Sequence, residues 1–364
     1  MRRVLVVIAF VGILLLAGCS GAGSGIEAEA ESEPESEPEP APDEAAESDS
    51  ESDTDPQTPV DGDGELEIHH IDVGQADSTL LLTPDGETVL IDTGDWRQDG
   101  SGVIAYLDAH EIDRIDHLVS THAHADHIGG HAAIIEAFET NRDGIGAIYD
   151  SGITHTSQTY QNYLDAVDEH DVDLFVVEEG DELPIENERL SGLVVNPPAG
   201  ESGDDLHYNS VSIVFEFGEV RYLTTGDAET DAEERMVEAW ADELDVDIYQ
   251  AGHHGSSTSS TPLFIDAVAP KIAIISSDVD SQYGHPHDEV LEAFAERDIE
   301  TYWTGVHGDI VLTTDGSEID IETTEAFSTD PTELLAAKSN TDDTDDTDSY
   351  SIALPSVPIV TVEG

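Results

Sequence analysis

The chain has 364 residues and a formal net charge of −72, because 83 Asp and Glu residues oppose only 11 Lys and Arg residues. The scarcity of basic residues argues against a protein that binds DNA or RNA through a positively charged surface. The single cysteine, Cys19, excludes an internal disulfide framework, and a hydrophobic content of 38% argues against disorder along the whole chain.

The N-terminus has the pattern of an export signal. Met1-Arg2-Arg3 precedes 14 apolar or Gly residues, Val4 to Ala17, a run shorter than the roughly 20 residues that a transmembrane helix needs. The run leads into Ala17-Gly18-Cys19, which resembles a lipobox with a lipidated cysteine. The sequence therefore predicts a lipoprotein signal peptide over 1–19, lipidation of Cys19 and a lipid anchor on the extracellular face of the cell membrane. Export by the Sec or the Tat route stays open.

Two acidic segments flank the expected folded part. Residues 20–64 are rich in Glu, Ser, Pro and Asp, with repeated Glu-Pro steps, and we expect a disordered acidic tether because such a segment has no core to bury. The folded domain is predicted over 65–325. Residues 326–364 are predicted to form an acidic C-terminal tail, whose apolar stretch 352–362 is either an edge strand or loose.

Hydrophobic periodicity between residues 65 and 325 indicates many strands and several helices in mixed order, which is not a regular βαβ series and allows helices to cover two sheets. Strands are predicted at 65–73, 78–83, 88–91, 115–120, 173–177, 190–195, 211–217, 220–225, 248–251, 272–276, 301–304, 309–313 and 318–321, and helices at 104–110, 128–138, 158–167, 228–244 and 286–297.

The most informative stretch is Thr121 to His131. His122 and His124 are two residues apart at the end of an apolar strand, so their side chains point the same way, and Asp126 and His127 follow where the chain turns into a helix. Imidazoles and a carboxylate at this spacing supply ligands for two adjacent metal ions such as Zn²⁺, Mn²⁺ or iron.

This stretch resembles the HxHxDH signature of the metallo-β-lactamase superfamily. Three further segments resemble that family's motifs in the same order: Ile91-Asp92-Thr93-Gly94, the strand that ends in Gly226-Asp227, and Gly252-His253-His254-Gly255. The resemblance covers about residues 65–323. It implies an α+β fold, a four-layer αββα sandwich with a dinuclear metal site at one edge of the two sheets.

A subgroup is also indicated. Residues 71–78, 252–256 and 283–287 together resemble the hydrolase domain of the DNA-uptake competence protein ComEC. Ala76 stands where that group has a second Gly, and Asn209-Ser210 stands where most family members have a third ligand histidine. His207 is close in sequence, and it is either a ligand or a surface residue.

The resemblance implies two divalent metal ions, with Zn²⁺ favoured and Mn²⁺ as the alternative. Asp126 and Asp227 become catalytic residues as well as ligands, and Asp92 orients a ligand histidine. The implied ligands are His122 and His124 at the first metal, Asp126, His127 and one of His253 and His254 at the second metal, and Asp227 between them.

Four residues are expected to contact the substrate. His285 and His287 flank Pro286 at a predicted helix start, an arrangement typical of phosphate binding, although they are also compatible with a plain helix entry. Asn209 and Ser210 are the other two. The expected function is that of a membrane-anchored extracellular phosphodiesterase or nuclease, with a phosphodiester or nucleic acid as substrate.

Other functions are also compatible with these motifs. The same site suits hydrolysis of a lactone, thioester, β-lactam or phosphocholine ester, and a non-catalytic metal-binding surface protein is a further alternative. Nothing in the sequence indicates a protein partner.

Most of the acidic residues lie in the folded part, since residues 65–325 contain 59 of the 83 acidic side chains and only 8 basic ones. Such a charge repels itself in dilute salt, whereas at 1 M salt the Debye length is only about 3 Å. The chain has two lysines, Lys271 and Lys338. We interpret this composition as adaptation to an extremely saline environment.

This interpretation predicts that the melting temperature rises steeply between low and multimolar KCl, because salt screens the repulsion between carboxylates. Thermal unfolding followed by circular dichroism over a KCl series measures it. A melting temperature that does not change with salt would show the interpretation to be wrong.

Overall fold

A computed structural model describes residues 2–3 and 64–342 of the chain. The predicted signal peptide beyond Arg3, the lipidation site Cys19, the tether up to residue 63 and residues 343–364 lie outside the described residues. Within the described part, no helix combines the length and the apolar character needed to cross a bilayer.

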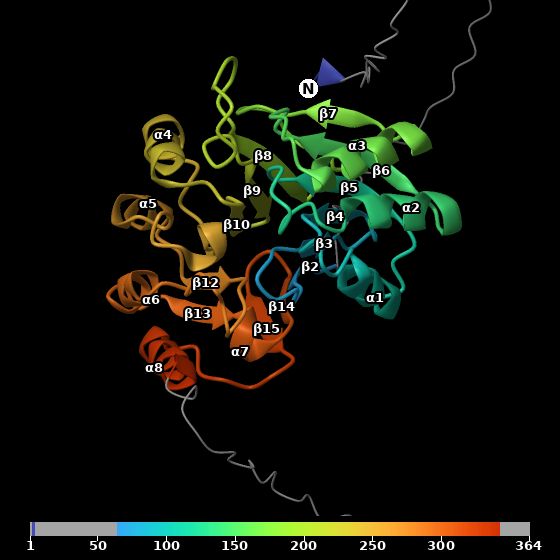
Figure 1. The fold of residues 1–364 in the computed structure, drawn as a ribbon. Coiled ribbons are helices and arrows are strands. Elements are labelled where there is room, and N and C mark those ends of the chain that lie inside the picture. Colours follow the sequence, from blue (N-terminus) through green and yellow to red (C-terminus); the bar gives the residue numbers. More distant parts are fainter. Residues whose placement is uncertain (1, 4–63, 343–364) are drawn as a thin grey trace, which may run out of the picture. The chain divides into compact units, whose positions relative to one another are not determined.

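Two β-sheets form the centre of the fold (Figure 1). The larger sheet has the strand order β1-β7-β6-β5-β4-β3-β2-β14-β15, and the smaller has the order β13-β12-β11-β10-β9-β8. The strands of the larger sheet are β1 (Arg2–Arg3), β2 (Leu66–His70), β3 (Thr79–Leu82), β4 (Thr88–Ile91), β5 (Ile115–Ser120), β6 (Ile145–Asp150), β7 (Leu174–Val176), β14 (Ile310–Thr314) and β15 (Ile319–Thr323). Those of the smaller sheet are β8 (Leu190–Asn196), β9 (Ser212–Phe217), β10 (Val220–Thr224), β11 (Ile248–Gln250), β12 (Ile272–Ile275) and β13 (Glu300–Trp303).

Helices cover the outer face of each sheet. Figure 1 shows α1, α2 and α3 beside the larger sheet and α4, α5, α6 and α8 beside the smaller one. The helices are α1 (Ser101–Ala109), α2 (His131–Asn141), α3 (Gln158–His170), α4 (Thr230–Trp240), α5 (Pro262–Val268), α6 (Asp288–Ala295), α7 (Thr304–His307) and α8 (Pro331–Asp342), with a 3-10 turn, η1, at Gly252–Gly255.

Three apolar cores separate the four layers, and strand alternation explains them. In β9, Ile213 and Phe215 point into the core between the two sheets, while Val214 points into the core under the helices of the smaller sheet. In β4, Val89 faces the inter-sheet core and Leu90 faces α1–α3. Successive side chains of a strand point to opposite faces of the sheet, so both faces of these strands are buried. The predicted four-layer αββα fold is confirmed.

The C-terminal boundary predicted at residue 325 is wrong. Residues of the expected tail form α8, which packs against α6. Leu334 is fully buried in the core under the smaller sheet, and Lys338 Nζ lies 2.6 Å from an Asp288 carboxylate oxygen. Thr332 and Glu333 of this helix are exposed, while Leu334 and the partly buried Leu335 provide its apolar contact with the core.

Smaller differences concern individual elements. Strand β6 was not predicted, because Gly144 and Gly146 interrupt its apolar pattern. Helix α5 was not predicted either, although Thr261 accepts a capping bond from the Phe264 amide and Pro262 occupies the first turn. The helix expected at 128–138 begins at His131, since the preceding residues form the histidine-rich loop.

Parallel strands place the predicted site residues at one edge. Strands β4 to β7 are parallel neighbours in the larger sheet, and β10 to β13 are parallel in the smaller sheet. Asp92 follows β4, His122 follows β5, Asp227 follows β10 and His254 follows β11. The carboxyl ends of parallel strands are the usual location of ligand sites in open sheets.

Candidate metal centre

The loop after β5 carries the HxHxDH residues and is folded by close backbone approach. The amides of His127 and Ile128 both donate to the His124 carbonyl, at 3.2 and 3.0 Å. A Cβ on Gly129 would lie 2.1 Å from the Trp96 nitrogen. Glycine at this position therefore allows the loop after β4 to pack directly against the histidine loop.

Asp227 is held at the end of β10 by its backbone. The Asp227 amide donates to Ser210 Oγ at 3.1 Å, and the preceding Gly226 has a φ of 50°. A Cβ there would approach Ser210 Oγ to 2.5 Å and the Thr121 Cβ to 2.7 Å. The carboxylate of Asp227 consequently lies, almost fully buried, between the residues contributed by the two sheets.

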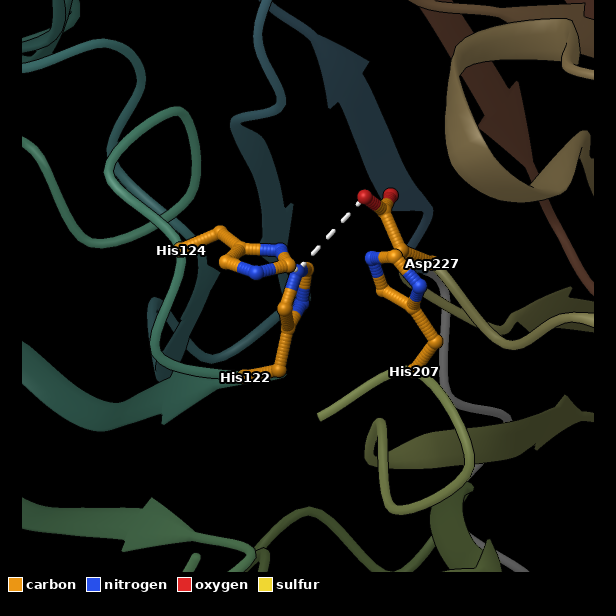
Figure 2. Close-up of side chains that lie close together, drawn as sticks. All are labelled: His122, His124, His207 and Asp227. Atoms are coloured by element: carbon orange, nitrogen blue, oxygen red, sulfur yellow. Dashed lines mark hydrogen bonds and ion pairs between the residues drawn. The ribbon is translucent and has the colours of Figure 1, made fainter. Parts of the chain in front are cut away.

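A first ligand cluster consists of His122, His124, His207 and Asp227, whose donor atoms all lie within 4.8 Å of one another (Figure 2). His122 Nε2 is 2.8 Å from His124 Nδ1 and 3.5 Å from Asp227 Oδ2. The His124 and His207 ring centroids are 4.9 Å apart. The structure favours a metal-ligand role for His207 over that of a surface residue.

A second ligand cluster contains His127, His254 and the same Asp227. Asp227 Oδ1 lies 3.1 Å from His127 Nε2 and 3.9 Å from His254 Nε2. Asp126 adds a carboxylate oxygen 3.4 Å from His254 Nε2. One carboxylate thus contributes an oxygen to each cluster, which is the arrangement that the family resemblance implied for Asp227.

Hydrogen bonds at the Nδ1 atoms fix the ring orientation of both histidines in the second cluster. Asp92 Oδ2 accepts a hydrogen bond from His127 Nδ1 at 2.7 Å, and the Ser276 carbonyl accepts one from His254 Nδ1 at 3.0 Å. Both Nε2 atoms are therefore directed at Asp227. Asp92 also accepts from the Thr121 amide at 2.9 Å and has a φ of 56°, the left-handed conformation often found in residues at functional sites.

Asp77 also lies behind these histidines. Its Oδ2 is 3.9 Å from His127 Nδ1 and 3.7 Å from His254 Nδ1, and its Oδ1 accepts a hydrogen bond from Gln250 at 3.1 Å. Because it faces the Nδ1 atoms rather than the Nε2 atoms, we assign it to positioning rather than to metal binding.

The chemistry of the site fits divalent cations. Three buried atoms are directed into the same space, His127 Nε2, His254 Nε2 and Asp227 Oδ1, and none of them makes a well-aligned hydrogen bond, although His127 Nε2 and Asp227 Oδ1 are only 3.1 Å apart. Buried polar atoms are rarely left without a partner, and imidazole nitrogens with carboxylate oxygens are the donors that Zn²⁺ and related ions prefer. The two clusters therefore form a site for divalent metal.

The charges differ between the clusters. Burial lowers the pKa of His122 well below its usual value and that of His124 to about 4, so both imidazoles are neutral at neutral pH. Burial also opposes protonation of His127 and His254, but neighbouring carboxylates outweigh it, raising the pKa of His127 well above 6.5 and that of His254 to about 9. Cations at the second cluster must displace these protons.

His253 and His254 have different partners. Both have left-handed backbone angles, with φ values of 52° and 56°, and the turn sends their side chains apart. His253 Nδ1 is 3.1 Å from Glu229 Oε1, and its ring centroid is 4.8 Å from that of His207. His253 Nε2 lies 3.6 Å from Asp227 Oδ2, on the side of the first cluster. Of the two residues that the sequence left open, the structure groups His254 with the second cluster.

The two predicted phosphate histidines have ring centroids 4.8 Å apart, but their surroundings differ. His285 is buried beside the centre, with its ring centroid 6.2 Å from that of His254. Both ring nitrogens of His287 are used internally, since Nδ1 accepts from the Ser257 amide at 2.8 Å and Nε2 is 3.2 Å from the Tyr283 carbonyl. The first turn of α6 carries two carboxylates, which disfavours a phosphate at that helix start. Substrate contact by His285 stays a prediction.

Asn209 and Ser210 lie inside the protein. Both are fully buried; the Asn209 side chain donates to the Asp205 carbonyl at 2.8 Å, and Ser210 supports Asp227. Their expected contact with substrate also stays a prediction. The sequence did not assign roles to Asp77 or Glu229, although Asp77 lies within the motif at 71–78 and Glu229 follows Asp227 by two residues.

Comparison with known proteins agrees with this geometry. Residues 71–277 match the model of the metallo-β-lactamase superfamily. The chain therefore belongs to this superfamily, whose members are generally metal-dependent hydrolases.

Its relatives include an operon protein and a competence protein. The chain is 31% identical over 264 residues to ComE operon protein 3 of Bacillus subtilis, a match that covers 68% of this chain and 33% of that protein. It is 28% identical over 238 residues to competence protein ComA of Neisseria gonorrhoeae, covering 65% of this chain and 30% of that protein. The chain thus spans about a third of the length of these relatives.

A solved structure of CmlA, a diiron β-hydroxylase from Streptomyces venezuelae, is similar with a TM-score of 0.46 and 15% identity, over 69% of this chain and 54% of that one.

We predict that His207→Ala weakens binding of one metal ion at least about tenfold, because the first cluster then loses one of its three imidazoles. Metal content after dialysis against a graded zinc chelator measures the effect. His170→Ala is the matched control, since His170 pairs with Glu136 on α2 away from the centre. Unchanged metal retention in His207→Ala would contradict the assignment of His207 as a ligand.

Proposed function

We propose that this chain is a metal-dependent phosphodiesterase that cleaves nucleic-acid strands. The observation that carries the proposal is the sharing of Asp227 by two ligand clusters. When bound, two adjacent divalent cations supply a water of lowered pKa and positive charge for both the attacking and the leaving oxygen of a phosphoryl group.

The chain's own carboxylates then have different tasks. The Asp227 side chain is only 2% exposed. Its carboxylate therefore neutralises the charge of bound cations and fixes their position. The Asp126 side chain is 31% exposed, and it lies at the open side of the second cluster. Asp126 is therefore the residue that orients the nucleophile. Burial raises the pKa of Asp126, but His254 and His127 outweigh burial and hold that pKa well below its usual value, so this carboxylate is a weak proton acceptor.

Two further observations support a nucleic acid as the substrate. One of the relatives named above is a competence protein, and residues 71–78, 252–256 and 283–287 resemble the hydrolase domain of a DNA-uptake competence protein. The acidic surface does not oppose this choice in concentrated salt, because repulsion between protein and phosphates is screened beyond a few Å. Contacts with the substrate then come from the metal centre and from residues close to it.

The location is proposed from the N-terminal sequence alone. The basic start, the apolar run and the lone Cys19 support export and lipid anchoring on the outer face of the membrane. In that position the enzyme would meet nucleic acid outside the cell.

We predict that the chain loaded with Zn²⁺ or Mn²⁺ hydrolyses single-stranded DNA or bis-p-nitrophenyl phosphate in multimolar KCl. Asp126→Ala and Asp227→Ala should each lower kcat/KM by at least about 100-fold, because each removes a negative ligand from the centre. Asp168→Ala, which removes an exposed carboxylate from α3, is the control with the same change in charge.

Nitrocefin, a lactone, a thioester and p-nitrophenyl acetate, assayed on the same sample, cover the carbonyl alternatives. Turnover of one of these with no phosphodiester cleavage in either metal would contradict the proposal.

A further inference from the structure

A cavity of about 420 Å³ opens beside the metal ligand Asp126 and is lined by two exposed aromatic side chains, Trp96 and Tyr283. Trp96 is 53% exposed and Tyr283 is 59% exposed. Among the described residues, Leu263 and Phe327 are the other large apolar side chains with such exposure, and neither lines this cavity. Large aromatic rings left in water beside a reaction centre favour a ligand with a flat, apolar face.

Hydrogen bonds and ring contacts hold both aromatic residues close to the metal centre. The Trp96 amide donates to the Ala125 carbonyl at 3.0 Å, one residue before Asp126. On the other side, the Tyr283 ring centroid lies 5.7 Å from that of His285, which in turn neighbours His254. The Tyr283 and His285 amides both donate to Ser281 Oγ, at 3.3 and 3.2 Å. The aromatics thus stand at a fixed position relative to the metal ligands.

The polar lining of the cavity suits the edge of a nucleobase. Three neutral amides contribute to it, those of Gln75, Gln98 and Gln282, together with the carboxylates of Asp278 and Asp280. Amides both donate and accept hydrogen bonds, and carboxylates accept from the N–H groups of bases. The same carboxylates repel a phosphate, so the phosphate of a bound nucleotide is directed away from this cavity and toward the metal centre.

A quaternary ammonium group would also suit aromatics beside carboxylates, but a cation is already present. The Arg97 guanidinium lies 5.0 Å from the Trp96 ring centroid and pairs with Asp95 at 3.0 Å. A second cation on this ring would meet a like charge. A neutral base ring meets no such repulsion, and its stacking does not depend on charge that concentrated salt would screen.

We propose that Trp96 and Tyr283 hold one unstacked nucleobase of a single-stranded nucleic acid, with an adjoining phosphate at the metal centre. The assignment of that phosphate rests on the proposed function. The base contact is an interaction of its own and can be measured without cleavage.

The test compares two cleavage-resistant phosphorothioate oligomers of equal length, oligothymidylate and an abasic backbone, which bind to the full metal-loaded chain in multimolar KCl. Fluorescence anisotropy gives the dissociation constants. Trp96→Ala and Tyr283→Ala should each weaken binding of oligothymidylate roughly tenfold or more, the effect typical of losing one aromatic stacking partner, and leave binding of the abasic oligomer unchanged. Tyr283→Phe, which keeps the ring, should retain binding, and Phe327→Ala is the control at an exposed aromatic outside the cavity.

Equal losses on both oligomers, or no loss on either, would overturn the base site. Hydrolysis of p-nitrophenylphosphorylcholine that depends on Trp96 and Tyr283, without an effect on oligothymidylate, would overturn it in favour of a quaternary ammonium site. Cleavage of unmodified oligomers, measured in parallel, separates the two proposals. Base-dependent binding without cleavage refutes the phosphodiesterase alone, and cleavage with base-independent binding refutes the base site alone.

Discussion

The buried carboxylate of Asp227 is the constraint on which the rest of the site depends. An ionised carboxylate taken out of water is costly unless it has opposite charge or hydrogen-bond donors around it. Burial raises the pKa of Asp227, but the imidazoles of His127 and His254 outweigh burial and hold that pKa well below its usual value. Because these histidines follow strands of both sheets, the carboxylate stays charged only where the two sheets meet along their carboxyl edges.

The αββα architecture provides this meeting point and the rigidity that it needs. Three apolar cores fix the strands that end at the site. Asp92, His253 and His254 adopt left-handed backbone angles there, each of which costs free energy that the surrounding packing must offset. The result is a centre whose histidines already point their free nitrogens at a common space.

Much of this could be predicted from local sequence, and the remainder depends on contacts distant in the chain. Strands ending before His122 and Asp227 are recognisable from their apolar runs, and the spacing of His122, His124, Asp126 and His127 indicates a metal site by itself. The choice of His254 over His253 depends on a turn with two positive φ values and on the carbonyl of Ser276 on another strand. Neither is visible in the local pattern.

The same reason explains the other residues that were missed or left open. His207 joins the first cluster only because the loop before β9 folds over His124. Asp77 gains its place because β2 and β3 bring it behind both histidines. Helix α8 is held by Leu334 and the partly buried Leu335 within a polar segment, a signal too weak to outweigh the acidic composition around it.

The central claim is that Asp227 joins two cation sites, and the magnetic coupling of bound Mn²⁺ tests it most directly. We expect the chain to bind two Mn²⁺ ions whose electron paramagnetic resonance spectrum shows exchange coupling, which is lost in Asp227→Ala because the shared carboxylate is gone. A wild-type chain that binds one uncoupled Mn²⁺ ion, or a coupled pair that persists in Asp227→Ala, would contradict the account.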